Sequence, residues 1–261
     1  MRTLSKLVMA AVIGAAFLAA SASTASAVSV AQVGKSSVIA TEGPDHSLDF
    51  YWQAIGSKPW HREVVAGKNT TYSAPSVAQV GSSSVIAVQG PHQSLLFYWQ
   101  TIGSKPWHRE VVAGKSTTFT APSVAQVGKS SVIVAMGPVA SLRYYWQTIG
   151  TKPWHAEVAA GAGTTYSAPS VAQVGKSSVI AAEGPTNSLR FYWQAIGTKP
   201  WHTEIVALGN TTFGAPSVAQ VGTSSVIAAQ GPANSLRFYW QAIGAVPWHP
   251  EVVAGHATTF A

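Results

Sequence analysis

Short apolar runs separated by turn residues dominate the hydrophobic pattern of this chain. The first block contains four such runs, at residues 29–34, 36–44, 47–56 and 60–67. From Leu48 to Trp52 every second residue is Leu, Phe or Trp, which is the period of two typical of an extended strand. Gly, Pro and Ser stand between the runs and leave no apolar window of helical length. The pattern therefore predicts four β-strands in this block.

The same block occurs five times. The phrase Ser-Val-Ala-Gln-Val-Gly returns every 47 residues, at Ser29, Ser76, Ser123, Ser170 and Ser217. The copies cover residues 29–75, 76–122, 123–169, 170–216 and 217–261. A fixed period of this length is typical of repeat architectures. The sequence predicts a single repeat domain over residues 28–261.

Sheets that cannot bury both faces alone are stable when they are arranged radially. We therefore predict an all-β fold, a five-bladed β-propeller with one four-stranded antiparallel blade per 47-residue repeat. Residues 29–33 are narrow and suit the crowded strand nearest the axis, whereas Pro250 cannot donate to a neighbour and suits the free outer edge. If blades coincide with repeats, we expect the first copy to pack against the fifth and close the ring. A blade assembled from both ends of the chain is the alternative.

The first 27 residues have the three zones of an export signal. Arg2 and Lys6 form a positive head, an apolar stretch follows, and Ala25-Ser26-Ala27 supplies a small-residue cleavage site. This pattern predicts a secretory signal peptide over residues 1–27 and an extracellular protein that begins at Val28. The apolar stretch is short for the roughly 20 residues that span a bilayer, so we expect no membrane insertion.

Composition narrows the classes of partner. The chain has no cysteine, which excludes disulfides and thiolate metal sites. Without Arg2 and Lys6, 14 basic residues remain against 9 acidic ones, and the basic residues are scattered singly over the repeats. This arrangement does not indicate a nucleic-acid surface. The abundant Ser, Thr and Gln suit neutral partners that form hydrogen bonds.

The order of these signals resembles a known group of proteins. Ser-Ala-Pro or a close variant precedes the first strand of copies 2 to 5. Each repeat has Gly-Pro after the second strand, an aromatic third strand of the form Ser-Leu-x-Phe-Tyr-Trp (Tyr in place of Phe in copy 3), and a Trp-containing outer strand that ends at Gly. This order resembles the repeats of bacterial β-propeller lectins of the fucose-binding kind. Five units of this length also resemble the five-bladed lectins of the tachylectin-2 type. The resemblance implies several sugar sites between neighbouring blades.

The motif Trp-His-x-Glu is invariant in all five copies. A Trp at the start of an edge strand can stack on the C–H face of a sugar, and the His and Glu can bond its hydroxyls, as can Tyr51 and Gln53. The alternative is that the Trp packs and the His makes structural hydrogen bonds. The candidate ligand-binding residues are Trp60, His61, Glu63, Trp107, His108, Glu110, Trp154, His155, Glu157, Trp201, His202, Glu204, Trp248, His249 and Glu251.

A second invariant Trp stands in the middle of the third run of each copy, at Trp52, Trp99, Trp146, Trp193 and Trp240. Large aromatic side chains in such positions usually belong to a core. We expect these five rings to pack between blades.

Metal binding and catalysis receive less support. His61 and Glu63 would face the same side of a strand, yet two ligands fall short of the three or four that zinc needs. Glycoside hydrolysis requires two carboxylates in different surroundings, whereas identical copies place identical Glu residues in identical surroundings. Glu42 and Glu183 are the exceptions, since the other copies have Gln or Met at this position. We expect no catalytic residues, no metal and no cofactor, and leave open an asymmetric pair at Glu42 and Glu183.

These observations predict a secreted, multivalent carbohydrate-binding protein, a lectin with equivalent weak sites at the blade seams. Its partners would be glycans or glycoconjugates on cell surfaces, because linked weak sites gain avidity on a surface that repeats its epitope. Recent duplication alone would also repeat every residue. A protein-binding or cell-wall-adhesive propeller is the alternative function, and a glycoside hydrolase is the third.

Overall fold

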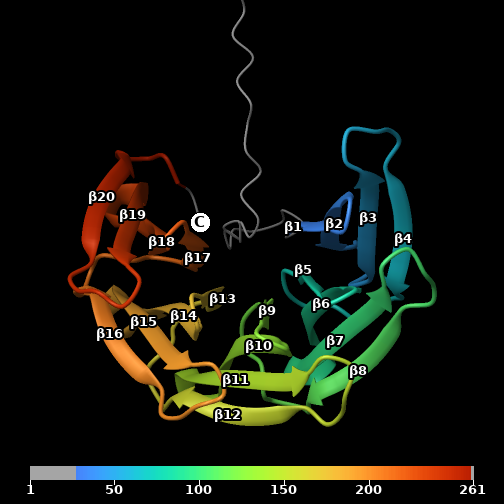
Figure 1. Ribbon diagram of the computed structural model, residues 1–261, viewed down its shortest axis with the longest axis horizontal. Helices are drawn as coiled ribbons and strands as arrows, with labels where there is room; N and C mark the ends of the chain where they lie inside the picture. The colour runs from blue at the N-terminus through green and yellow to red at the C-terminus, as the bar shows by residue number, and fades with distance from the viewer. Residues whose placement is uncertain (1–27, 260–261) are drawn as a thin grey trace, which may run out of the picture.

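The computed structural model describes residues 28–259 of the chain. Within this range the regular elements are strands and four short 3-10 helices, and the strands form five separate antiparallel sheets of four (Figure 1). Each sheet consists of strands from one repeat. The predicted signal peptide, residues 1–27, lies outside the described residues.

The sheets are numbered in chain order. Sheet 1 contains Val28–Val33 (β1), Ser36–Glu42 (β2), Leu48–Ala54 (β3) and His61–Ala66 (β4). Sheet 2 contains Ser76–Val80 (β5), Ser83–Gly90 (β6), Ser94–Thr101 (β7) and His108–Ala113 (β8). Sheet 3 contains Ser123–Val127 (β9), Ser130–Gly137 (β10), Ser141–Thr148 (β11) and His155–Ala160 (β12).

Sheets 4 and 5 repeat the arrangement. Sheet 4 contains Ser170–Val174 (β13), Ser177–Gly184 (β14), Ser188–Ala195 (β15) and His202–Ala207 (β16). Sheet 5 contains Ser217–Val221 (β17), Ser224–Gly231 (β18), Ser235–Ala242 (β19) and His249–Ala254 (β20). In sheets 2 to 5 a 3-10 helix joins the second strand to the third, at Pro91–Gln93 (η1), Pro138–Ala140 (η2), Pro185–Asn187 (η3) and Pro232–Asn234 (η4).

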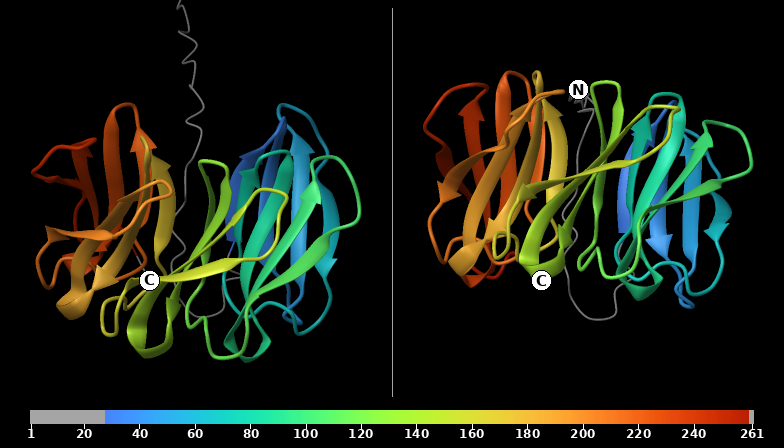
Figure 2. Two further views of the ribbon diagram at one scale, coloured as in Figure 1. Left: turned by 60° about the horizontal axis from the view of Figure 1, so that its bottom comes forward. Right: turned by 90° about the horizontal axis from the view of Figure 1, so that it is seen from below.

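The strands of each sheet follow one another from the centre outwards. The first strand of each sheet lies near the axis and contacts the first strand of the next sheet, so that β1, β5, β9, β13 and β17 form the hub (Figures 1 and 2). The fourth strand is the outer edge. Pro250 lies in β20 on that edge, where its missing N–H leaves no sheet bond unmade. This confirms the predicted direction from the axis to the rim.

The core lies between consecutive sheets. Because side chains alternate across a strand, Val38 and Phe50 of sheet 1 face sheet 2 and pack with its Ile86 and Tyr98. All four side chains are at most 2% exposed. Equivalent residues form the cores between the later sheets. Each repeat therefore completes its neighbour's core, as expected of an architecture in which one unit cannot bury its own faces.

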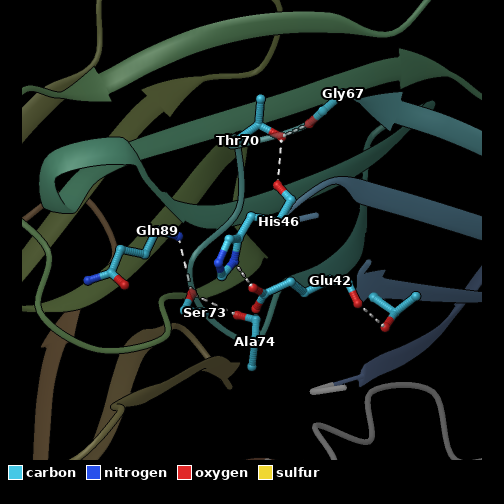
Figure 3. Close-up of polar contacts among 8 residues, drawn as sticks. Glu42, His46, Gly67, Thr70, Ser73, Ala74 and Gln89 are labelled. Atoms are coloured by element: carbon cyan, nitrogen blue, oxygen red, sulfur yellow. Dashed lines mark hydrogen bonds and ion pairs between the residues drawn. The ribbon is translucent and has the colours of Figure 1, made fainter. Parts of the chain in front are cut away.

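Return segments hold the sheets together at the end of the strands where β2 turns into β3. Figure 3 shows the first of these segments, which leaves β4 and runs to β5. The Thr70 N–H donates to the His46 carbonyl at 2.8 Å, which ties the segment to sheet 1. The Gln89 N–H then donates to Ser73 Oγ at 3.2 Å, which ties it to sheet 2. Adjacent sheets are thus linked by hydrogen bonds through the return segment as well as by packing.

The five sheets form an open arc. Figure 1 shows sheets 1 and 5 on opposite sides of an opening. Val221 of β17 faces this opening and is 48% exposed, whereas the equivalent Val174 is 2% exposed. Trp60 of sheet 1 is likewise exposed. The expectation that the first copy packs against the fifth is therefore wrong, and the alternative of a shared blade does not occur either, since each sheet comes from a single repeat.

The arc has a physical cause in its repeated hub contacts. The N–H of Gly34 donates to Gln79 Oε1 of the next sheet at 2.8 Å, and the same bond recurs at 2.8 Å in the other three seams. Identical contacts impose an identical rotation from each sheet to the next. Five sheets at this rotation stop short of a full circle.

Replacement of Ile149 tests whether the arc is open in solution. Ile149 of sheet 3 packs over Gly81 of sheet 2, whereas the equivalent Ile55 has no preceding sheet and is 56% exposed. Ile149→Ala should lower the free energy of unfolding by roughly 1–2 kcal/mol, and Ile55→Ala should change it by less than about 0.5 kcal/mol, in urea titrations followed by Trp fluorescence. Equal losses would mean that Ile55 is buried in a fifth seam.

Candidate functional site

A pocket of about 300 Å³ lies in the seam between sheets 1 and 2. Its position follows from the strand order, since each seam is bounded by the broad face of one sheet and by the turn between the third and fourth strands of the next. Sheet 1 contributes Val33, Ser36, Val38, Phe50, Trp52 and Glu63, and sheet 2 contributes Ser84, Gln100, Ile102, Gly103, Ser104 and Lys105. The pocket is therefore apolar at its base and polar at its rim.

The Glu63 carboxylate joins the two sheets. Trp52 is directly opposite His61 on the neighbouring strand, so Glu63, two residues further on, is within diagonal reach of the Trp52 indole. Trp52 Nε1 donates to Glu63 Oε1 at 3.2 Å, and Trp107 Nε1 of sheet 2 donates to Glu63 Oε2 at 3.1 Å. One carboxylate thus receives two charge-assisted hydrogen bonds, one from each side of the seam.

The bond across the seam recurs in the other three seams, and Trp99 and Trp193 complete the bridge at Glu110 and Glu204 with own-sheet bonds of 3.2 and 2.9 Å. The second Trp of each of sheets 3, 4 and 5 donates to the Glu of the sheet before it, at 2.9, 2.7 and 3.0 Å for Trp154 to Glu110, Trp201 to Glu157 and Trp248 to Glu204. Each of these rings also meets an aromatic ring of that preceding sheet edge to face, as Trp107 meets Phe50 at 5.1 Å between centroids.

The structure groups the predicted site residues differently from the sequence motif. The Trp and Glu of one Trp-His-x-Glu motif face different seams, and each seam combines the Glu of one copy with the Trp of the next. Trp60 and Glu251 lie at the two ends of the arc, where both are exposed. Four seams are therefore complete, and the remaining two half-seams border the opening.

The five histidines stack on the first Trp of their own sheet. His61 lies against Trp52 with ring centroids 4.4 Å apart, and the later copies repeat the stack at 4.2–4.3 Å. His61 is not among the residues that line the pocket. Its geometry is that of a support for the indole ring.

The first Trp of each copy is only partly a core residue. Trp52 packs against the core between sheets 1 and 2, as expected, yet it remains half-buried and its ring lines the pocket. A mid-strand position predicted burial, but the bond to Glu63 draws the indole toward the rim of the seam. Trp52 and its equivalents therefore present a partly exposed aromatic surface to a ligand.

Gln100 supplies an acceptor that the protein leaves unpaired. Its side chain lines the pocket and is 5% exposed, and its Oε1 has no hydrogen-bond partner within the described part of the chain. Gln147, Gln194 and Gln241 are likewise buried, and their Oε1 atoms have no partner in the described structure. A buried unpaired acceptor costs about 1–3 kcal/mol, so four copies of one represent a substantial loss of stability. The sequence pointed to Gln53, the equivalent residue of sheet 1, which lies at the opening and is half-buried.

Sequence reasoning missed the lysines of the seams. Lys105 Nζ lies 3.9 Å from Glu63 Oε1, with the lysine side chain 76% exposed and the glutamate side chain 14% exposed. Lys152 and Lys199 occupy the same place in the next two seams. The signal was present, because a Lys precedes Pro-Trp-His in four of the five copies.

The seam offers an indole surface and hydrogen-bonding groups, but its described residues do not include the carboxylate pair of a glycosidase. The described contacts place one carboxylate in each seam. Glu42 and Glu183 belong to sheets 1 and 4, which are not adjacent, and hydrolysis needs two carboxyl groups within about 5–9.5 Å. Glu183 is buried, which raises the pKa of its carboxyl, and it accepts a hydrogen bond from Asn187 of its own turn. Glu42 pairs with His46 (Figure 3).

A larger cavity of about 850 Å³ lies on the axis, between the hub strands. Its repeated glutamines already accept hydrogen bonds from the hub glycines. The axial cavity thus offers a ligand fewer unpaired polar groups than the seams do.

Residues 28–259 contain neither a metal-binding cluster nor a membrane-spanning helix. No group of three His, Asp or Glu side chains in this range is close enough to hold a metal ion. In the same range, no helix is long and apolar enough to span a membrane.

The sequence matches no protein-family model and no curated protein. Solved structures do match the fold. The BP39L lectin from Burkholderia pseudomallei aligns with a TM-score of 0.78 at 15% identity, over 88% of this chain and 70% of that one. AofleA from Arthrobotrys oligospora aligns with a TM-score of 0.64 at 12% identity, over 88% and 72%.

The lectin of Aleuria aurantia, described as a six-bladed β-propeller with a novel mode of fucose recognition, aligns with a TM-score of 0.60 at 14% identity, over 88% of this chain and 79% of that one. These likenesses confirm the predicted resemblance to fucose-binding β-propeller lectins at the level of the fold. The present chain has five blades and aligns with part of these longer chains.

Replacement of Gln147 tests whether this glutamine stabilises the fold or is available to a ligand. Gln147→Leu removes a buried unpaired acceptor and should leave the free energy of unfolding unchanged or raise it by up to about 1 kcal/mol. The matched control is Gln126→Leu, which removes the acceptor of the Gly81 N–H. This variant should lower the free energy of unfolding by about 0.5–1.5 kcal/mol. Urea unfolding of both variants measures the difference. A clear loss of stability in Gln147→Leu would show that its amide serves the fold.

Proposed function

We propose that this protein is a carbohydrate-binding lectin whose four complete seams each bind one sugar residue of a glycan. The observation that carries the proposal is the set of four buried glutamine oxygens without a partner in the described chain, the first of which shares its pocket with Trp52 and Glu63. Proteins seldom leave such groups unpaired unless a ligand or water pairs with them. The likeness of the fold to solved lectins supports the same function.

The chemistry of the seam suits a sugar. A sugar has an apolar C–H face and a ring of hydroxyls, and the seam offers an indole surface from Trp52 beside the acceptors Gln100 and Glu63. Gln100 Oε1 loses its hydrogen bonds to water when the protein folds. A ligand hydroxyl that donates to this oxygen therefore displaces no other hydrogen bond of the acceptor, and the new bond contributes nearly in full to the binding free energy. The pocket volume of about 300 Å³ is at the lower end of the range for small-ligand sites and suits a single monosaccharide unit.

Repetition of the seam allows weak single sites to bind with avidity. Four sites in one rigid arc can engage a surface that displays many copies of one glycan, and linked binding typically raises the overall affinity by 10²–10⁴. Glycoconjugates on cell surfaces display their epitopes in this way. Export by residues 1–27 would place the protein where such surfaces are met. The function needs no catalytic group and no cofactor.

The solved neighbours suggest the first sugar to test. SapL1 and the Aleuria aurantia lectin have been crystallised with α-methyl fucosides. Both chains align with this one at 11–14% identity, which carries no information about the specificity of the present seams. Methyl α-L-fucoside is therefore the initial probe, and a glycan array identifies the sugar if it differs.

Calorimetric titration of residues 28–261 with the sugar selected on the array should give four sites per chain. The variant with Leu at Gln100, Gln147, Gln194 and Gln241 should keep its circular dichroism spectrum and lose affinity by roughly tenfold or more, because each site loses one buried acceptor. Gln53→Leu, at the opening, is the matched control and should bind like the parent protein.

Two outcomes would contradict the proposal. One is an array on which no glycan binds and no free monosaccharide inhibits, combined with binding to a protein ligand. The other is turnover of a chromogenic glycoside, which would make the protein a hydrolase.

A further inference from the structure

The fourth seam differs from the other three at one residue of its rim. The position two residues before the second Trp is Lys in copies 1 to 4 and Val246 in copy 5. Because the turn of each copy overhangs the seam with the preceding sheet, Val246 belongs to the seam between sheets 4 and 5. Its side chain is 78% exposed.

The change leaves the Glu204 carboxylate without a cation. In the first three seams the Lys Nζ lies 3.9, 3.8 and 3.5 Å from the seam glutamate. Glu204 instead receives three neutral donors, with Trp193 Nε1 at 2.9 Å, Trp248 Nε1 at 3.0 Å and Gln241 Nε2 at 3.4 Å. None of the ion pairs formed within residues 28–259 involves Glu204.

The orientation of Gln241 is a second difference at the same seam. Its amide nitrogen points to the carboxylate, a contact that the glutamines of the other three seams do not make in the described structure. A neutral donor thus stands close to where the other seams have an ammonium group. The fourth seam keeps the unpaired Gln241 Oε1, and its half-buried Glu204 carboxylate has no cation beside it among residues 28–259.

A charged group in a ligand would sense this difference. An ammonium group at the rim of the fourth seam is attracted by Glu204, whereas at the other seams a lysine already holds the place and repels a second cation. The lysines are 76–77% exposed, so solvent and salt screen the effect. Exposed ion pairs correspond to affinity changes of up to about fivefold.

We propose that the fourth seam is an amino-sugar site, which binds a hexosamine with a free ammonium group more tightly than the matching neutral hexose. The three lysine-bearing seams prefer the neutral sugar. This inference rests on the proposed function, because it assumes that the seams bind sugars. It makes Val246 the residue that determines specificity, so that one chain carries three sites of one kind and one of another.

The test compares methyl α-D-glucosaminide with methyl α-D-glucoside, which differ only in the amino group, and uses methyl α-L-fucoside to report seam binding independently. Titrations of residues 28–261 at pH 6, where the amine is protonated, should show one site per chain with about fivefold higher affinity for the glucosaminide. The preference should disappear at pH 9, where the amine is largely neutral.

Charge swaps assign the preference to one seam. Val246→Lys should abolish it, and the triple variant Lys105→Val, Lys152→Val, Lys199→Val should raise the number of glucosaminide-preferring sites from one to four. Lys58→Val, at the opening, is the control and should change nothing. All these side chains are on the surface, so the variants should fold.

The outcomes separate this inference from the proposed function. Binding of neutral sugars at four sites without an amine preference, or a preference that survives Val246→Lys, would overturn the inference alone. Absence of binding by all three glycosides, and by any sugar on the array, would overturn both.

Discussion

The hydrogen bonds that one glutamate accepts from two tryptophans, one in its own sheet and one in the next, are the interaction on which the rest of this structure depends. Glu63 with Trp52 and Trp107 is the first example. The carboxylate fixes the two indole rings, and the indoles fix the spacing of the sheets at the rim, as the Gly34 to Gln79 bond fixes it at the hub. The pocket is the space that these two constraints leave between them. A charged acceptor suits this task because its hydrogen bonds are stronger than those between neutral groups.

Much of the fold could be predicted because it depends on local signals. The alternation from Leu48 to Trp52, the 47-residue period and the proline in the outermost strand are each read within a few residues, and they determine strands, repeat and direction. Whether the five sheets close into a ring could not be predicted from the sequence, because closure depends on the angle by which each sheet is rotated from the one before it. That rotation arises from contacts between residues about 45 apart in the sequence, such as Gly34 with Gln79.

The candidate site was also predicted only in part. The sequence grouped the Trp and Glu of one Trp-His-x-Glu motif into one candidate site, whereas the sheets bring the Glu of one copy to the Trp of the next. It also gave no sign that Gln100 would be buried without a partner, because burial of a strand residue depends on the sheet placed over it. Lys105 could have been found by comparison of the copies, where Val246 is the exception.

The proposed function does not require a closed ring. A seam site requires two consecutive sheets, so the arc provides four complete seams for the proposed sites although its ends remain apart. Near-identical repeats explain the sameness of these sites, and single substitutions at their rims explain how they can differ. The solved lectins of similar fold are longer chains, and one is a six-bladed ring, so blade number varies among proteins of this fold.

A crystal structure of residues 28–261 with a bound monosaccharide tests the central claim most directly. The account predicts one sugar in each complete seam, with a hydroxyl within hydrogen-bond distance of the Oε1 of Gln100, Gln147, Gln194 or Gln241 and with the sugar ring against the neighbouring tryptophan. Sugar bound in the axial cavity or on the return segments, with the seam glutamines still unpaired, would contradict it.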